Sequence, residues 1–342
     1  AMTEKEGGFD LLENTSTATP LDVDGEYELN GHKWFCSAPM CDAFLTLAQT
    51  DAGITCFLVP RFRPDGTKNN FFIQRLKDKL GNHSNASSEI EYSGTWAVRV
   101  GEEGRGVPTI IEMVTHTRLD CGLASAGFMR QGVAQAIHHA MHRSAFGKKL
   151  RDQPLMKNVL ADLAVEWEAA ATLMFRLARA YDAGMSDPAQ EPFIRIATAV
   201  AKYWVCKRGP HHAYEAMECL GGAGYVEEGP MPRLYREAPL TSIWEGSGNV
   251  MCLDVLRALN KEPETAPAFL AELERARGGD ARVDRAVEGI KSELRDTSNL
   301  EIRARRIVEK MAVAIEGALL VQHGHPAVAD AFCASRLDGD HG

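Results

Sequence analysis

The spacing of apolar residues changes near Val107, and this change restricts the folds that the chain can adopt. Before it, short apolar and β-branched runs are separated by Pro, Gly, Asp and Asn, a pattern typical of strands joined by turns. After it, apolar residues recur at spacings of three and four, as on one face of a helix. Strands followed by helices predict an α+β chain and argue against a doubly wound parallel sheet.

Residues 1–100 are predicted to form a small antiparallel β domain, either a barrel or a sandwich. Expected strands at 26–29 and 32–36 flank Asn30-Gly31, a pair that predicts a tight hairpin because both turn positions tolerate a positive φ. Further short strands are expected at 44–49, 54–59, 71–76 and 88–92. A Gly- and Glu-rich segment at 101–106 resembles a phosphate loop only superficially, because no Lys-Ser/Thr follows it. It is interpreted as a connector.

Residues 101–260 are predicted to form a four-helix bundle. The strongest helical pattern runs from Met156 to Tyr181, where apolar residues alternate spacings of four and three along one seam. Other helices are expected around 119–140, from Phe193 towards Gly221 with an irregularity near Pro210, and after Glu245. The tail at 261–342 is rich in Glu, Arg and Ala, and it predicts a helical extension with helices at 268–277, 282–295 and 302–322.

The composition of this 342-residue chain limits its partners. A net charge of −9 argues against nonspecific affinity for nucleic acid over the whole surface. No run approaches the roughly 18 apolar residues of a membrane span, so no membrane partner is expected. The eight cysteines form no CxxC pair, which favours reduced thiols and a cytoplasmic location. Because the chain begins at Ala1 in a charged segment, we expect an N-terminal portion to be missing.

One stretch, at residues 240–259, combines a lone carboxylate with a helix start. Trp244 and an apolar approach precede Glu245, and Gly246-Ser247-Gly248-Asn249 follows it at the beginning of an apolar helix. Apolar neighbours raise the pKa of a carboxylate towards the range of a general base. Free backbone N–H groups at a helix N-terminus suit a phosphate or an electron-rich cofactor. The alternative is a plain N-cap with an exposed Glu in the first turn.

Other clusters of polar residues have ordinary explanations. His138 and His142 have metal-ligand spacing, but the Glu and third ligand of a HExxH site are lacking, so no metal is expected. No GxSxG motif indicates a serine hydrolase. A row of arginines at 303, 305 and 306 is flanked by Glu301 and Glu309, which favours a solvated helix face.

Taken in order, several motifs resemble those of the acyl-CoA dehydrogenase family over about residues 1–260. Each has a counterpart in the family's flavin site, bundle or catalytic turn: Met2-Thr3-Glu4 with Gly7-Gly8, Trp34-Phe35-Cys36-Ser37, Thr117-Arg118, Arg143-x-x-Phe146-Gly147 with Gln153, Gly221-Gly222-x-Gly224-Tyr225, Arg236-Glu237 and Trp244-Glu245-Gly246-Ser247. The fold that this resemblance implies is a β-barrel followed by a four-helix bundle. The missing N-terminal portion would then be the family's N-terminal helical domain.

The resemblance implies an FAD-dependent oxidoreductase that dehydrogenates an acyl-CoA thioester at its α and β carbons, with a short branched acyl chain as the first expectation. Glu245 would be the catalytic base, and no metal is implied. The residues implied to contact FAD are Met2, Thr3, Trp34, Phe35, Cys36, Ser37, Arg143, Phe146, Trp244, Gly246, Ser247 and Asn249. Arg143 and Phe146 belong to an element that in the family reaches the FAD of a neighbouring subunit, and the resemblance also implies packing as a homotetramer.

The segments 76–82 and 84–87 resemble the adaptive-response branch of the family, flavoproteins induced by DNA alkylation. Members of that branch are credited with binding double-stranded DNA through a C-terminal helical extension. The resemblance therefore implies an alternative function, protection of DNA from alkylation with little dehydrogenase turnover. Two departures from the family pattern, Phe9 for Ser and Glu218 for Gln, favour a third hypothesis, a scaffold that keeps the fold without FAD.

Overall fold

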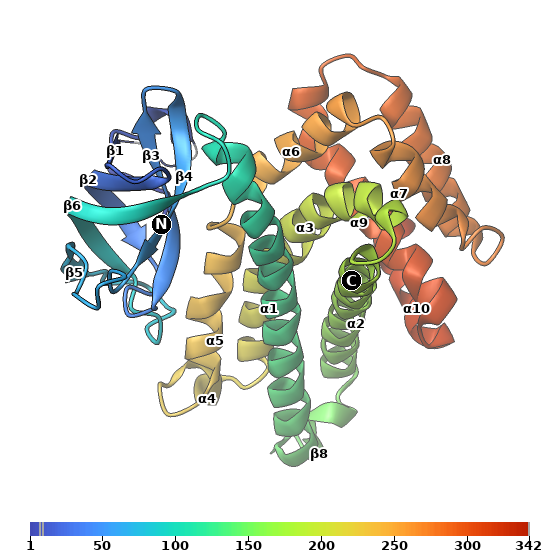
Figure 1. Cartoon of the computed structure of the whole chain (residues 1–342). Helices are drawn as coiled ribbons and strands as arrows, with labels where there is room; N and C mark the ends of the chain where they lie inside the picture. The colour runs from blue at the N-terminus through green and yellow to red at the C-terminus, as the bar shows by residue number, and fades with distance from the viewer. Residues whose placement is uncertain (7, 9, 341–342) are drawn as a thin grey trace. The chain divides into compact units, whose positions relative to one another are not determined.

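The computed structural model describes residues 1–6, 8 and 10–340. Within them the chain forms two compact units, Ala1–His116 and Thr117–Gly342. The first unit contains the six-stranded sheet and the second is helical (Figure 1). Domain limits at residues 100 and 260 remain predictions. Gly7 and Phe9, which belong to the first motif that resembles a flavin segment, lie outside the described residues.

The sheet of the first unit closes into a small barrel, which confirms the predicted fold of this region. Its strands are β1 (Thr17–Pro20), β2 (Glu26–Cys36), β3 (Ala43–Thr50), β4 (Gly53–Pro60), β5 (Phe71–Leu76) and β6 (Ser88–Val100). The order is β2-β1-β3-β4-β6-β5, and β2 also pairs with β6, so the sheet closes on itself while β5 lies outside β6. The pairings are antiparallel except between β1 and β3, which are parallel where Thr17 meets Gln49.

The hairpin predicted at Asn30-Gly31 is wrong, because both residues lie inside β2. The register with β6 shifts between Leu29 and Asn30, which marks an irregularity in the strand. Gly31 has φ +144°, and a Cβ at this position would collide with the backbone and hydroxyl of Ser16. The glycine is therefore required for a close approach between two segments of the barrel and does not form a turn.

The second unit is built from long helices that the apolar spacing predicts. The bundle helices are α1 (Gly106–His142), which begins in the first unit, α2 (Pro154–Gly184), α3 (Glu191–Glu218) and α6 (Gly248–Lys261). The tail adds α7 (Thr265–Glu274), α8 (Ala281–Arg295) and α9 (Leu300–His323). Helix α3 passes through Pro210 without the expected interruption. The short helices α4 (Gly222–Tyr225), α5 (Met231–Glu237) and α10 (Pro326–Phe332) were not predicted.

Bundle and tail share one hydrophobic core. Buried Leu177, Val200 and Val255 of the bundle belong to the same cluster as Phe269 and Met311 of the tail. Because burial of apolar area is the main favourable contribution to folding, the tail helices stabilise the bundle directly. None of the helices in the described residues has the length and apolar character needed to cross a bilayer.

A carboxylic acid lies inside this core. Glu316 of α9 is 2% exposed, and its Oε2 accepts a hydrogen bond of 3.0 Å from the indole N–H of Trp204. Burial, and secondly the nearby charge of Glu166, raises the pKa of Glu316 well above its ordinary value. Arg208 and Arg336 approach the same cluster but bind Glu166. The folded state therefore holds the Glu316 proton more tightly than the unfolded state does.

Glu316→Gln should reduce the dependence of stability on pH. Between the unfolded pKa, near 4.5, and the higher folded pKa, the folded state binds more protons, so stability falls as pH rises, by up to about 1.4 kcal/mol per pH unit. The variant lacks this titrating carboxyl, so its stability should fall less than that of the wild type between pH 5 and pH 8. Urea unfolding at the two pH values measures the free energy of unfolding of each protein. Glu309→Gln, at an exposed position of α9, is the control. If the stability difference between Glu316→Gln and the wild type were the same at pH 5 and pH 8, the raised pKa of Glu316 would be contradicted.

Gly31→Ala should destabilise the barrel by about 2–4 kcal/mol, because a positive φ and a collision with Ser16 act together. Gly25→Ala provides the matched control, since φ is +84° there but no atom lies near the added carbon. Its cost should be about 1 kcal/mol. Urea unfolding monitored by tryptophan fluorescence measures both values, and equal costs would show that the contact with Ser16 is unimportant.

Candidate active site

The carboxylate singled out in the sequence lies on a strained turn at the start of α6. A 3₁₀-helix ends at Ser242, the turn covers 243–246, Ser247 is the N-cap and α6 begins at Gly248. Glu245 has φ +57°, a left-handed conformation that is uncommon for a residue with a side chain. Such conformations persist only where surrounding contacts enforce them, and they cluster at functional sites.

Three side chains from α1 and α3 enforce this turn. Lys202 Nζ donates hydrogen bonds to the carbonyl oxygens of Trp244, at 2.8 Å, and of Gly246. Arg118 Nε donates to the carbonyl oxygen of Glu245 at 3.0 Å. The hydroxyl of Thr117 donates to the Glu245 carboxylate at 2.8 Å. Two adjacent residues of α1 thus hold the backbone and the side chain of Glu245 at the same time.

These contacts determine where the N–H groups of the turn point. The described residues contain no cis peptide bond, and in a trans peptide the N–H points opposite to the preceding C=O. Because the carbonyls of 244–246 face cations, the N–H groups of Glu245, Gly246 and Ser247 face away from those cations. No described residue accepts a hydrogen bond from any of the three. The turn therefore presents a carboxylate together with unused N–H donors.

A second layer of charges fixes Arg118. Its Nη1 donates to Asp254 Oδ2 at 3.0 Å, and Arg195 binds the other oxygen of Asp254 at 3.0 Å. Asp254 is on α6 and is 8% exposed, so its charge is only weakly screened by solvent. The carboxylate joins α1, α3 and α6 at the level of the turn. This network gives Arg118 the orientation that it needs to reach the Glu245 carbonyl.

Lys202 is buried without a hydrogen-bonded carboxylate. Its side chain is 1% exposed, and burial lowers its pKa below the ordinary value. Removing an unpaired ammonium group from water costs several kcal/mol. The two carbonyl dipoles offset part of this cost, and the nearby Glu245 charge offsets some of the rest. A cation in such a place is costly for stability, which is a feature of functional sites.

The other polar groups near Lys202 are neutral. Burial raises the pKa of the Cys121 thiol to about 12 and also raises that of Cys206. Neither thiol is therefore a nucleophile at neutral pH. The Ser125 hydroxyl donates a hydrogen bond of 2.7 Å to the Thr241 hydroxyl, which in turn donates to the Ala238 carbonyl at 3.0 Å. Among these groups, Glu245 remains as the candidate base.

In the first unit, the segment Met2-Thr3-Glu4 is anchored beside β2. The backbone N–H of Trp34 donates to the Thr3 carbonyl at 2.8 Å. Glu4 forms a buried ion pair with Lys33, and it also accepts hydrogen bonds from the backbone of Thr15 and Ser16. The structure thus brings together two motifs that lie about thirty residues apart in the sequence. Both are motifs that resemble flavin-binding segments.

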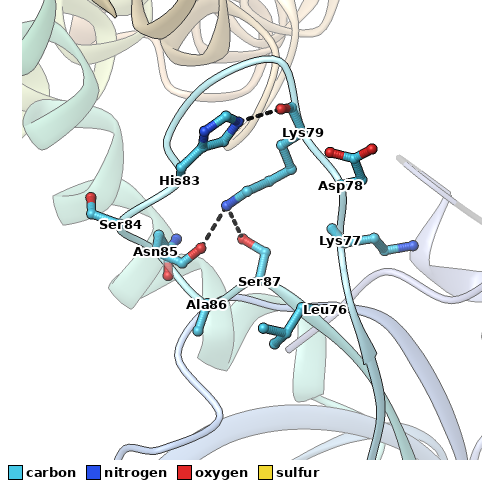
Figure 2. Close-up of a pocket in the computed structure, with 9 residues that line it drawn as sticks. All are labelled: Leu76, Lys77, Asp78, Lys79, His83, Ser84, Asn85, Ala86 and Ser87. Atoms are coloured by element: carbon cyan, nitrogen blue, oxygen red, sulfur yellow. Dashed lines mark hydrogen bonds between the residues drawn. The ribbon is translucent and has the colours of Figure 1, made fainter.

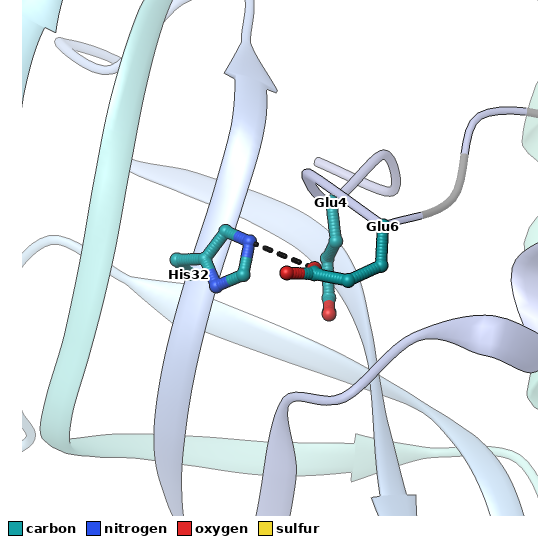
Figure 3. Close-up of side chains that lie close together, drawn as sticks. All are labelled: Glu4, Glu6 and His32. Atoms are coloured by element: carbon teal, nitrogen blue, oxygen red, sulfur yellow. Dashed lines mark ion pairs between the residues drawn. The ribbon is translucent and has the colours of Figure 1, made fainter.

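Glu4, Glu6 and His32 lie close enough together to suggest a cation site (Figure 3). Their own contacts explain the cluster without a metal. Glu4 is occupied by Lys33 and the backbone of 15–16. His32 Nε2 accepts the backbone N–H of Lys5 at 3.1 Å and lies 3.3 Å from Glu6. The group anchors the N-terminal segment, and no metal site is assigned to it.

A small cavity in the first unit is lined by residues 76–79 and 83–87 (Figure 2). Lys79 Nζ crosses the loop and donates to the carbonyls of Asn82 and Asn85, each at 2.7 Å, and to the Ser87 hydroxyl at 3.0 Å. His83 contacts the Lys79 carbonyl. The hydrogen bonds of Lys79 therefore hold this loop in place, and we assign no chemistry to the cavity.

Comparison with known proteins identifies the family. The sequence matches the acyl-CoA dehydrogenase middle domain over residues 1–95 and the acyl-CoA dehydrogenase C-terminal domain over residues 104–260. The chain belongs to the acyl-CoA dehydrogenase family. It is 46% identical over 337 residues to AidB of Escherichia coli (strain K12), which is named as an acyl-CoA dehydrogenase, and the match covers 98% of this chain and 62% of AidB.

Two solved structures have the same fold. Caenorhabditis elegans ACDH-11 in complex with C11-CoA superposes with a TM-score of 0.89 at 31% identity, over 98% of this chain and 64% of that one. Butyryl-CoA dehydrogenase from Megasphaera elsdenii has a TM-score of 0.68 at 29% identity, over 76% of this chain and 67% of that one. The chain therefore spans less than two thirds of AidB and of ACDH-11.

Acyl-CoA dehydrogenases are FAD-dependent flavoproteins, and residues in each unit fit such a cofactor. In the first unit, Lys77 Nζ lies 3.1 Å from the centre of the half-buried Trp34 ring and covers one of its faces. The hydroxyls of Thr3 and Ser37 have no hydrogen-bond partner among the described residues, which leaves them available for the polar edge of a flavin. Phe35 is exposed, whereas the Cys36 side chain lies in the barrel core, which leaves only its backbone for the cofactor.

In the second unit, Trp244, Gly246, Ser247 and Asn249 surround the N-terminus of α6. Gly246 has φ +102°, and the N–H groups of this first turn have no partner among the described residues. Unpaired N–H donors and the positive end of the helix dipole suit the polar chain of a dinucleotide cofactor. Asn249 is exposed, and its Oδ1 accepts a hydrogen bond of 2.8 Å from Arg305 Nε of α9.

Arg143 and Phe146 lie far from the Glu245 turn. They follow the end of α1, where β7 (Ser144–Ala145) and β8 (Lys148–Lys149) form a short hairpin (Figure 1). Thr117, which binds Glu245, is 25 residues away along the same helix, or about 38 Å at 1.5 Å per residue. The structure therefore does not bring Arg143 and Phe146 to the Glu245 turn of their own chain.

The sequence interpretation missed residues that hold Glu245 in place. Thr117 and Arg118 were identified as a bundle motif, while Lys202 and Asp254 were not singled out. The available signal for Lys202 was a single cation in the otherwise uncharged run 197–206 (ATAVAKYWVC). Asp254 similarly lies on the apolar side of α6. A charge on a buried face requires a partner, but the sequence does not say which one.

Asp254→Asn should destabilise the second unit by about 3 kcal/mol, since Arg118 and Arg195 would lose the carboxylate that balances them. Urea unfolding at neutral pH measures the loss. The same substitution at the exposed Asp182 of α2 should change stability by less than about 0.5 kcal/mol. If Asp254→Asn lowered the free energy of unfolding no more than this control does, the ion pairs of Asp254 would not stabilise the turn.

Proposed function

We propose that this chain carries the catalytic turn of an FAD-dependent acyl-CoA dehydrogenase, with Glu245 as the base. The observation that carries the proposal is the Glu245 turn, where a left-handed backbone presents a carboxylate and unused N–H donors together. Membership of the family supports an oxidoreductase. A relative of the same fold was solved with a C11-CoA ligand, which supports an acyl-CoA substrate here.

In the proposed reaction, the Glu245 carboxylate takes a proton from the α-carbon of the thioester. The Thr117 hydroxyl holds one carboxylate oxygen, so the other keeps a defined direction towards the substrate. The N–H of Glu245 donates to the thioester carbonyl oxygen, which becomes negative as the proton leaves. When bound, FAD supplies the acceptor for the hydrogen and electron pair that leave the β-carbon.

The acyl chain that the protein accepts is a finer proposal. A short branched chain such as isovaleryl is the expectation from the sequence, whereas the C11-CoA complex of ACDH-11 supports a longer one. The chain spans 62% of AidB, and the activity of the whole protein is likewise a proposal. We propose a thioester substrate and expect isovaleryl-CoA and undecanoyl-CoA to distinguish the two lengths.

We also propose that the hairpin of β7 and β8 contacts another copy of the chain, as in a homotetramer. Phe146 at its tip is 97% exposed and has φ +51°. A large apolar side chain that is fully exposed in a strained conformation is typical of a contact surface. Its distance from the Glu245 turn of its own chain supports a role at the cofactor of a neighbour.

DNA protection, the alternative function, finds less support in the tail. Arg303 binds Glu293 at 2.6 Å and also contacts Asp296, while Arg306 and Lys310 bind the same Glu293. Arg305 binds Asn249. Each arginine of this row already has a partner within the chain, so DNA phosphates would have to compete for it. Dehydrogenation is therefore the function that we propose, and DNA binding stays a prediction.

Glu245→Gln should slow reduction of the bound flavin by acyl-CoA by a factor of about 10²–10⁴, because an amide cannot accept the α-proton. The amide still accepts the Thr117 hydrogen bond, so FAD binding and folding should be unchanged. Anaerobic addition of isovaleryl-CoA or undecanoyl-CoA, followed by absorbance of the flavin, measures the reaction. Reduction of the variant at the wild-type rate would disprove the role of Glu245.

A further inference from the structure

We propose that Lys202 is a positioning residue that aims the Glu245 N–H at the carbonyl oxygen of the thioester. This inference rests on the proposed function, because it assigns a task to the turn that carries the base. Lys202 touches neither the Glu245 side chain nor any reacting atom that we assign. It acts through two peptide groups of the turn, the one that precedes Glu245 and the one between Gly246 and Ser247.

The geometry of the contacts carries the inference. Lys202 Nζ holds the carbonyl of Trp244, and the peptide that contains this carbonyl also contains the Glu245 N–H. Its second hydrogen bond, to the Gly246 carbonyl, prevents the turn from rotating about that peptide. Because a trans peptide is planar, the direction of its C=O bond fixes the direction of its N–H bond. The direction of the donor is thus set by a side chain on the opposite side of the turn.

The charge of Lys202 supports the same role. Lys202 is 1% exposed and belongs to α3, a helix whose other buried side chains are mostly apolar. No carboxylate accepts a hydrogen bond from its ammonium group; in the described residues its acceptors are the two carbonyls of the turn. A neutral apolar residue would fill this space at lower cost if packing were its only purpose. What the ammonium group adds is a fixed donor for two carbonyls.

Thr117 and Arg118 complete this arrangement from the other side. Arg118 holds the Glu245 carbonyl, and Thr117 holds the carboxylate. Thr117 thus fixes the position of the Glu245 side chain, and Arg118 fixes the orientation of the peptide that follows Glu245. Lys202 fixes the orientation of the peptide that precedes it. Loss of Lys202 should therefore disturb the N–H donor while leaving the base in contact with Thr117. The two functions of the turn are separable by mutation.

The experiment compares Lys202→Met with the wild type in the full chain loaded with FAD. The probe is a 3-thia-acyl-CoA, whose β-position is sulfur, so that its α-protons can exchange while dehydrogenation is blocked. Two quantities are measured: the rate of deuterium uptake at the α-carbon in D₂O, and the infrared stretch of a ¹³C-labelled thioester carbonyl. The first requires the base and the N–H donor, and the second reports hydrogen bonding to the carbonyl oxygen alone.

Lys202→Met should slow exchange at saturating probe by roughly 100-fold, the effect of losing one donor to a developing oxyanion. The half-saturating probe concentration should change by less than about threefold, because other contacts dominate ground-state binding. The carbonyl stretch should move back towards the value of the free ligand. Lys202→Arg, which retains donors for carbonyls, should restore part of both signals. Lys207→Met, at an exposed position of the same helix, should match the wild type.

Each outcome separates this inference from the proposed function. If the wild type exchanges, Glu245→Gln does not, and folded Lys202→Met matches the wild type in both measurements, only the role of Lys202 is disproved. If the wild type fails to exchange, or Glu245→Gln exchanges normally, the proposed function fails as well. If Lys202→Met does not fold, Lys202→Gln replaces it, because its amide nitrogen ends one bond short of Nζ and cannot hold both carbonyls. Wild-type behaviour of Lys202→Gln would then disprove the inference.

Discussion

The burial of one ammonium group organises the second unit. Lys202 lies among apolar residues of α3, and within the described part of the chain its hydrogen-bond acceptors are carbonyls, so the fold must bring carbonyl oxygens to it. Those carbonyls come from a turn that local preferences alone would not form, since Glu245 has a positive φ. The cation and the strained turn therefore require each other. Arg118 and Asp254 extend this dependence to α1 and α6, which explains why charged residues occur inside an apolar bundle.

The C-terminal tail also depends on this region. Helix α9 shares the core of α3 and α6, and Arg305 on its surface binds Asn249 in the first turn of α6. Neighbouring Arg303 is held by Glu293 of α8. The tail thus supports the helix that begins just after the Glu245 turn, and its arginines form the contacts that hold the tail together. An overall excess of acidic residues in the tail is consistent with such internal pairing.

Periodicity predicted the long elements, because burial of an apolar face decides them. The spacings at 156–181 and 71–76 correspond to α2 and β5. The prediction failed at Asn30-Gly31, where a motif that is usually a turn serves a close contact with Ser16, a residue fourteen or more positions away. Short helices such as α4 and α5 were missed because four to seven residues carry too little periodic signal.

The candidate base could be predicted, but its surroundings could not, and the reason is sequence separation. Glu245 and its helix start are adjacent in the chain, so spacing shows them together. Thr117 and Lys202 are 128 and more than 40 positions away from the atoms that they bind, and no local pattern encodes those contacts. The sequence does contain one local inconsistency, a lysine in an apolar helix, and the structure adds a second, a left-handed backbone at a glutamate. Local preferences are overridden at such positions by contacts with residues that are distant in the sequence. Two inconsistencies that satisfy each other are therefore stronger evidence for a site than either residue alone.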